Sequence, residues 1–164
     1  MKTYVNSAGQ TEWSTINIGR GSRNVNFHDF TVDGAGGRPE DGTALISLGG
    51  LVDSYGSRKV EDCRFSRFRG ALGVKGLPVF ATWNDVQGSL VVEGFDISIA
   101  ANAVPSPYGM QAPILITGPW QSGYSFVNNR FSLQGQQWAA KVNGQMLTPA
   151  QFNALPNNSG NVFT

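Results

Sequence analysis

The amino-acid sequence predicts an all-β protein in which successive repeats stack their strands in parallel. One observation is a phrase that recurs four times, with an apolar residue followed five positions later by phenylalanine and then by Thr, Ser or Asp. Another is the abundance of glycine, 21 residues of 164, between short apolar runs, while amphipathic helical periodicity is almost absent. The copies of the phrase lie at 25–32, 60–67, 90–97 and 126–133.

The phenylalanines of the four phrases keep one register, with spacings of 35, 30 and 36 residues. A repeat of this period is typical of chains that stack their units. In a parallel stack, like side chains lie about 4.8 Å apart. We therefore expect a column of aromatic rings inside the molecule, formed by Phe30, Phe65, Phe95 and Phe131.

A second apolar run precedes each phrase, so each unit reads as strand, turn, strand and then a loop of variable length. The longest of these loops spans 100–112. A fifth run follows the last phrase. The runs are STINIG at 14–19, ALISLGG at 44–50, PVFATW at 78–83, PILITG at 113–118 and WAAKVNG at 138–144.

A meander of antiparallel hairpins is the alternative arrangement for regular short strands. It requires tight Asn-Gly or Asp-Gly turns that join neighbouring strands directly. The two Asp-Gly pairs, 33–34 and 41–42, instead flank a loop, and Asn143-Gly144 follows the last unit. Residues that recur in register therefore favour parallel stacking.

The phrase needs a bend, because residues five apart in a straight strand face opposite sides. Both the leading apolar residue and the phenylalanine can point inward if a corner lies between them. We expect these corners at His28-Asp29, Arg64, Glu93-Gly94 and Asn129-Arg130.

This layout resembles that of right-handed parallel β-helix proteins, such as bacteriophage tailspikes and pectate lyases. The resemblance rests on coil phrases such as SRNVNFHDFTVDG at 22–34 and GYSFVNNRFSLQG at 123–135 and covers roughly residues 13–143. It implies a short right-handed β-helix of about four to five coils over 13–144. It concerns the fold and carries no catalytic motif.

The two ends of the chain have separate roles in this prediction. Residues 1–12 read as an N-terminal arm, and 145–164 as a capping helix and tail. Thr148, Pro149 and Gln151 fit N-cap, N1 and N3 of a helix with a capping box, which would run through Phe152 and Leu155 and stop before Pro156. The apolar pair Val162-Phe163 fits either docking on a neighbouring subunit or a frayed end.

Composition excludes several classes of function. Net charge is +1 with no basic run, so we expect no nucleic-acid partner. No apolar stretch approaches about 20 residues, and the N-terminus lacks an apolar leader core, so we expect neither membrane insertion nor a signal peptide. The alignment sets His28, Cys63 and Glu93 in one column, but successive rungs do not converge as metal ligation requires. We expect no metal and no cofactor.

Candidate sites on this chain are few. Acidic pairs on adjacent coils could serve glycoside hydrolysis, but they arise by chance in any stack, and we assign no catalytic residue. Trp83, Trp120 and Tyr108 could form an aromatic platform for a sugar. The alternative for the tryptophans is that they cap the interior column or line a subunit interface.

These features lead to a functional expectation with two alternatives. The resemblance to tailspikes and the low charge favour a structural protein on a bacteriophage particle: a spike, fibre tip or capsid decoration. We expect a homotrimer that contacts other virion proteins and bacterial surface polysaccharide. The alternatives are a polysaccharide depolymerase, either glycosidase or lyase, and a carbohydrate-binding module of the same fold.

Overall fold

The computed structural model describes residues 4–5, 11–12, 16–35, 44, 46–49, 58–72, 78–83, 85–99, 112–132 and 137–164. This part of the chain is built almost wholly of β-strands, as the sequence predicts. Its one helix, α1 (Pro149–Asn153), has five residues, and no described helix has the length and apolar character needed to cross a bilayer. Strands β1 (Tyr4–Val5) and β2 (Thr11–Glu12) pair antiparallel with each other.

The first of two larger sheets consists of short strands, one from each predicted apolar run. Its parallel strands follow one another in chain order, with Ile16, Ile46, Phe80, Ile114 and Ala140 in one register. The last strand, β14 (Gln145–Leu147), pairs antiparallel with β13 and ends the sheet. The parallel strands are β3 (Ile16–Ile18), β5 (Ile46–Leu48), β7 (Phe80–Thr82), β10 (Ile114–Ile116) and β13 (Ala140–Val142).

The second sheet consists of the recurring phrases, and all its pairings are parallel. Two long strands, β4 (Arg23–Ala35) and β6 (Val60–Leu72), pair along their length. In later repeats the same path is divided into two strands, so β6 pairs with both β8 and β9. The divided strands are β8 (Val86–Glu93) with β9 (Asp96–Ile99) and β11 (Tyr124–Val127) with β12 (Arg130–Phe131), followed by β15 (Val162–Phe163).

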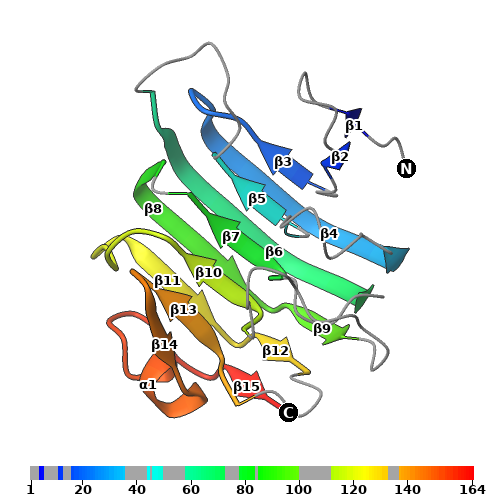
Figure 1. Ribbon diagram of the computed structural model, residues 1–164, viewed down its shortest axis with the longest axis vertical. Helices are drawn as coiled ribbons and strands as arrows, with labels where there is room; N and C mark the ends of the chain where they lie inside the picture. Colours follow the sequence, from blue (N-terminus) through cyan, green and yellow to red (C-terminus); the bar gives the residue numbers. More distant parts are fainter. Residues whose placement is uncertain are drawn as a thin grey trace.

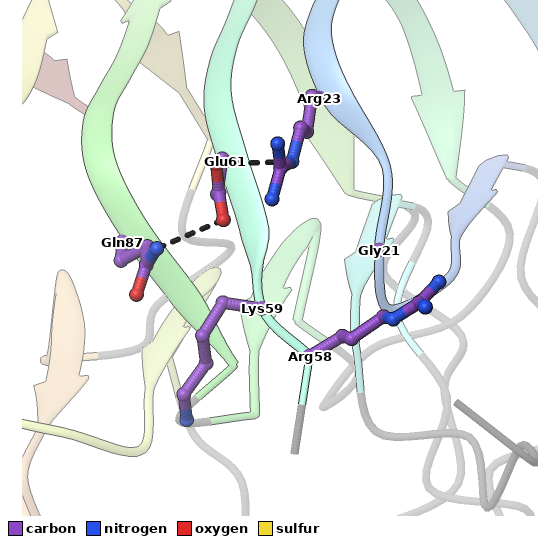
Figure 2. A pocket seen from close by; sticks show the side chains of 6 residues that line it. All are labelled: Gly21, Arg23, Arg58, Lys59, Glu61 and Gln87. Atoms are coloured by element: carbon purple, nitrogen blue, oxygen red, sulfur yellow. Dashed lines mark hydrogen bonds and ion pairs between the residues drawn. The ribbon is translucent and has the colours of Figure 1, made fainter. Parts of the chain in front are cut away.

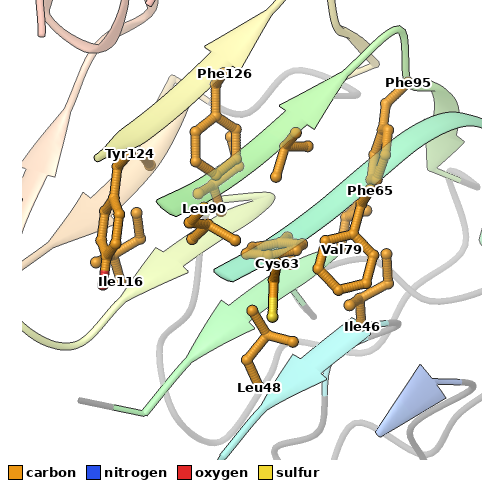
Figure 3. Close-up of a cluster of buried hydrophobic side chains, with 14 of the residues drawn as sticks. Ile46, Leu48, Cys63, Phe65, Val79, Leu90, Phe95, Ile116, Tyr124 and Phe126 are labelled. Carbon is orange, nitrogen blue, oxygen red and sulfur yellow. The ribbon is translucent and has the colours of Figure 1, made fainter. Parts of the chain in front are cut away.

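The two sheets form layers that run in the same order through the molecule, from β3 and β4 to β13 and β15 (Figure 1). Rings from both layers touch: Phe65 and Phe126 of the long-strand sheet lie 5.5 Å and 5.7 Å from Phe80 of the short-strand sheet, measured between ring centroids. The space between the layers is therefore filled by a single apolar core (Figure 3). The short strands β5, β7 and β10 are buried along their whole length, and parallel strands that pack on both faces have apolar sequences of this kind.

The long strands bend at the same place in every repeat. Residues with positive φ stand opposite one another there, and we call this column the corner. A left-handed residue turns the strand, so that Phe27 and Phe30 both face the core although they are three residues apart. The corner residues are Asp29, Arg67, Gly94, Asn128 and Gly160, with φ between +53° and +65°.

The corner was predicted correctly in two repeats and wrongly in two others. Asp29 and Gly94 lie within the predicted bends, whereas the second corner is Arg67 rather than Arg64 and the fourth is Asn128 rather than Asn129-Arg130. The corner of the second repeat was misplaced because both FHDF and FSRF contain two phenylalanines three residues apart. Alignment on the first member of the second pair shifts that repeat by three residues.

The phenylalanine column is corrected in the same way. Phe68, not Phe65, stands opposite Phe30, and Phe65 stands opposite Phe27. Phe131 is aligned with Ile97 in the backbone, although its ring reaches Phe95. Consecutive ring centroids along the column Phe30, Phe68, Phe95, Phe131 and Phe163 are separated by 5.4, 5.4, 6.3 and 5.6 Å.

Buried asparagines replace phenylalanine beside the corner in the last two repeats. Asn129 stands opposite Phe95, accepts the N–H of Phe95 and donates to the carbonyl of Val92. Asn161 follows below and accepts a hydrogen bond from the Asn129 amide at 2.8 Å. These amides satisfy backbone groups that the bend leaves unpaired, which a buried site requires.

The C-terminal segment closes one end of the core. Thr148 is the N-cap of α1, with Pro149 at N1 and a complete capping box to Gln151, as predicted. Phe152 is fully buried, with its ring centroid 5.4 Å from that of Phe126. Leu155 lies beyond the helix rather than within it and packs against the core.

The tail beyond the helix belongs to this chain's own sheet. Strand β15 pairs with β12, and the ring of Phe163 stacks on that of Phe131. Ser159 forms a further parallel bridge with Val127. Of the two readings of Val162-Phe163, docking on a neighbour and fraying, neither describes this pairing, because the pair adds one more rung to the column.

Candidate functional site

The predicted sugar platform is not assembled by the described residues. Trp83 is half-buried on the outer side of the short-strand sheet with Ala81 and Leu115, and its indole N–H donates to Ser47 Oγ at 2.8 Å. Trp120 belongs to the other cluster, where its ring contacts Tyr124, Phe126 and Phe152. Tyr108 lies outside the described residues. The two tryptophans thus pack against different parts of the fold.

The expected column of His28, Cys63 and Glu93 is also altered. Ser66, not Cys63, pairs with His28 on one side and with Glu93 on the other. Cys63 is buried and stands opposite Val25. Burial raises the pKa of the Cys63 thiol to about 11, so the sulfur is protonated and inert at neutral pH. No group of three potential metal-ligating side chains gathers in the described part of the chain.

The outer face of the long-strand sheet is polar and rich in ion pairs. Arg67 donates two hydrogen bonds of 2.6 Å to Asp29, which also contacts His28. Arg64 donates to Glu93 at 2.6 Å in the next column. Such exposed pairs contribute little to folding, but they present fixed charges to solvent along the sheet.

A cleft of about 550 Å³ opens at the beginning of this face, where β4, β6 and β8 start. Arg23, Glu61 and Gln87 occupy neighbouring positions on the three strands, and Arg58 and Lys59 lie just before β6 (Figure 2). Its volume is within the range of about 300–1,000 Å³ that is usual for ligand sites. The cleft is the candidate site of this molecule.

The rim of the cleft is positioned by the turn before β4. Gly21 has a φ of +87°, which a side chain would disfavour, and its N–H donates to the carbonyl of Lys59 at 3.0 Å. The carbonyl of Ser22 accepts the N–H of Glu61 at 2.9 Å. A Cβ at position 21 would make an ordinary van der Waals contact with Cδ of Arg58, at 3.5 Å, so the backbone conformation rather than lack of space favours glycine here.

The charges of the lining are unequal. Three cationic side chains, Arg23, Arg58 and Lys59, face one carboxylate, Glu61. The Glu61 carboxylate contacts Arg23 Nε at 3.2 Å and accepts from Gln87 Nε2 at 2.9 Å. Among the lining side chains the cations therefore outnumber the carboxylates by two, although the Asp85 carboxylate behind the lining lies 3.7 Å from Lys59.

Carboxylates beside the cleft are held by specific donors. Asp85 lies behind Lys59, with Arg20 at 3.0 Å and Lys59 Nζ at 3.7 Å. Asp62 accepts the backbone N–H and the hydroxyl of Ser89, which lowers the pKa of Asp62. A general acid in glycoside hydrolysis needs a raised pKa, so this setting suits a charged wall better than acid catalysis.

Sequence reasoning did not single out this cleft. The segment GRGSR at 19–23 draws attention as a weak likeness to a phosphate loop, but it lacks the Lys-Ser/Thr of that motif. Its real partners, Arg58, Lys59 and Gln87, come from two later repeats. The available signal was the presence of two short basic segments, 20–23 and 58–59, around the starts of two successive long strands.

Comparisons with known proteins supply no relative from which a role could be transferred. The chain matches no protein-family model, no curated protein and no solved structure.

Proposed function

We propose that this chain is a structural protein of a bacteriophage particle surface, a spike, fibre tip or capsid decoration. In this proposal it forms a homotrimer, contacts other virion proteins and binds bacterial surface polysaccharide. Its two parallel sheets are then two faces of a short right-handed β-helix, with one strand of each sheet in every coil.

The observation that carries the proposal is the column of in-register rungs. Rings of consecutive repeats stack on one another, and α1 and β15 cover the far end. A column that buries its apolar side chains and presents charged columns outside is suited to a mechanical role with surface contacts. Each unit of such a stack contacts only its neighbours, so in this proposal side-by-side association in the trimer adds contacts along the length of the column.

A binding role is favoured over hydrolysis by the engagement of the acids near the cleft. Glu61, Asp62 and Asp85 each contact donors of this chain. The polar face of the long-strand sheet offers guanidinium and amide donors of the kind that bind sugar hydroxyl and carboxylate groups. The depolymerase alternative would require at least one of these carboxyl groups to be a proton donor at neutral pH.

Light scattering of the purified chain tests the assembly. We expect a species of three times the 17.6 kDa chain mass that persists in mild denaturant. A stable monomer over the same concentration range would contradict the trimer and leave a binding module of a larger assembly.

Adsorption to bacterial surface polysaccharides tests the contact. We expect saturable binding to a subset of purified capsular and lipopolysaccharide glycans without a change in their chain length. Shortening of a bound glycan would replace the proposal by the depolymerase alternative. An absence of binding to every glycan and cell surface tested would refute the proposed contact with polysaccharide.

A further inference from the structure

The cationic lining of the cleft determines which glycans could enter it. Its three cations come from two segments: Arg23 from the start of β4, and Arg58 and Lys59 from the residues directly before β6. Arg58 and Lys59 point in opposite directions across the cleft (Figure 2). Positive charge is therefore spread along the cleft rather than gathered at one point, which suits an extended ligand with several charges better than a single small ion.

The positions of the polar groups fit the same class of ligand. The side chain of Arg23 is 69% exposed, so this guanidinium, paired on one side with Glu61, keeps a face open to solvent. Gln87 Nε2 has a second N–H beyond the one given to Glu61, and an amide donor of this kind serves hydroxyl or carboxylate oxygen equally well. Guanidinium groups bind carboxylate and sulfate through paired N–H donors.

We propose that the cleft lined by Gly21, Arg23, Arg58, Lys59, Glu61 and Gln87 binds a polyanionic glycan, one that carries carboxylate or sulfate groups along its chain. The inference rests on the proposed contact with polysaccharide and names the chemical class of that polysaccharide. Glu61 orients Arg23 and Gln87, and the excess of positive charge attracts the glycan from solution.

Binding is measured with dextrans that share one neutral backbone: dextran sulfate, carboxymethyl dextran and unmodified dextran. We expect both charged forms to bind the wild-type protein and the unmodified form not to bind. Affinity falls as salt rises, because the Debye length shortens from about 10 Å at 0.1 M to about 3 Å at 1 M ionic strength. Stronger binding of one charged form identifies the preferred group, and failure of both overturns the proposal.

Charge reversal locates the site. We expect Arg58→Glu to weaken binding of the charged dextrans about tenfold or more. The matched control is Arg69→Glu, an exposed arginine in the second half of β6, which should change affinity less than about twofold. Equal losses for the two variants would show attraction to overall charge rather than to the cleft and would overturn the assignment.

Two double variants that neutralise charge instead of reversing it provide a second test, in case the charge-reversal variant misfolds. Arg23→Gln with Arg58→Gln removes two cations from the cleft, and Arg69→Gln with Arg130→Gln removes two exposed cations elsewhere on the same sheet. Far-ultraviolet circular dichroism and thermal melting check that both pairs fold. Binding that is lost in the first pair and kept in the second supports the site, and the reverse pattern contradicts it.

Three further results separate this inference from the proposed function. A single-stranded oligothymidine that binds more tightly than either charged dextran would assign the cleft to nucleic acid and overturn the glycan. A monomer in light scattering that still binds charged dextrans through Arg58 would refute the trimer but support the cleft. A trimer that binds only neutral glycans would support the proposed assembly and refute the assignment of the cleft to a polyanionic glycan.

Discussion

At the residue scale, backbone conformation at the corner decides how the chain turns. Asp29 and Arg67 have φ of +55°, a region that most residues avoid, and they stand on consecutive repeats where glycine or asparagine takes the same place later. Their side chains form a bidentate ion pair on the surface. The turn is thus specified by position in the repeat more than by residue type.

Titration of Asp29 tests this surface cluster. Hydrogen bonds from Arg67, and then from His28, hold the pKa of the Asp29 carboxyl well below its usual range. Because the pKa is lowered in the folded state, the stabilisation is present above the unfolded value, near pH 4, and is lost as pH falls toward the folded pKa. We expect carbon-13 NMR to show the Asp29 pKa rising toward its usual value in Arg67→Gln. An unchanged titration curve in that variant would contradict the pairing.

Glycine at position 123 provides a test of close approach between repeats. A Cβ there would collide with the backbone carbonyl of Gly88 on the neighbouring strand, and backbone cannot move aside as a side chain can. We expect Gly123→Ala to lower the free energy of unfolding by about 2 kcal/mol or more, measured by urea denaturation. Gly144→Ala, whose Cβ has no neighbour within 4 Å, should cost about 1 kcal/mol from its φ of +81° alone. Equal losses would show that the contact is unimportant.

At the element scale, the columns of like side chains set the pairing of strands. Cys63, Phe65 and Phe68 are buried in the second repeat, while the equivalent Val25 and Phe27 of the first are half-buried. The core-facing side chains of a strand become fully buried only when a strand lies on each side of it in the sheet. This dependence on neighbours is the property by which stacked repeats fold cooperatively.

A double-mutant cycle tests the corrected phenylalanine column. Phe30 and Phe68 have nearly parallel rings, with an interplanar angle of 10°, so we expect Phe30→Leu and Phe68→Leu to be coupled by about 0.5–1.5 kcal/mol in urea denaturation. The control cycle pairs Phe30 with Phe65, which stands in the adjacent column. A larger coupling in the control than in the test pair would restore the register that sequence alignment alone suggests.

Substitutions in β15 test whether the tail is part of the fold. Phe163 stacks on Phe131 and meets Phe152 edge-on, whereas Val162 is 48% exposed. We expect Phe163→Ser to cost about 2–3 kcal/mol in the free energy of unfolding and Val162→Ser to cost less than about 0.5 kcal/mol. Thermal or urea unfolding of the two single variants decides the matter, and similar values for both would describe a tail that does not stabilise the column.

At the scale of the whole molecule, sequence periodicity predicts the architecture well and the surface poorly. The five short runs, the parallel order and the capping box at Thr148 could all be inferred, because burial forces apolar residues into register. The register of the second long strand could not, because FSRF offers two phenylalanines and only packing selects between them. The cleft was missed because its residues come from three repeats and share no motif.

Corner residues also bear on how such a molecule can change over time. Each repeat returns to the same left-handed position, yet the stretch of chain between successive corners differs in length from one repeat to the next. The corner brings each repeat back into register with its neighbours, so a connection of different length does not shift the strands that follow it. Insertions and deletions between the corners should be tolerated far better than a single residue added within a long strand, so new surface features can arise while the column remains as it is.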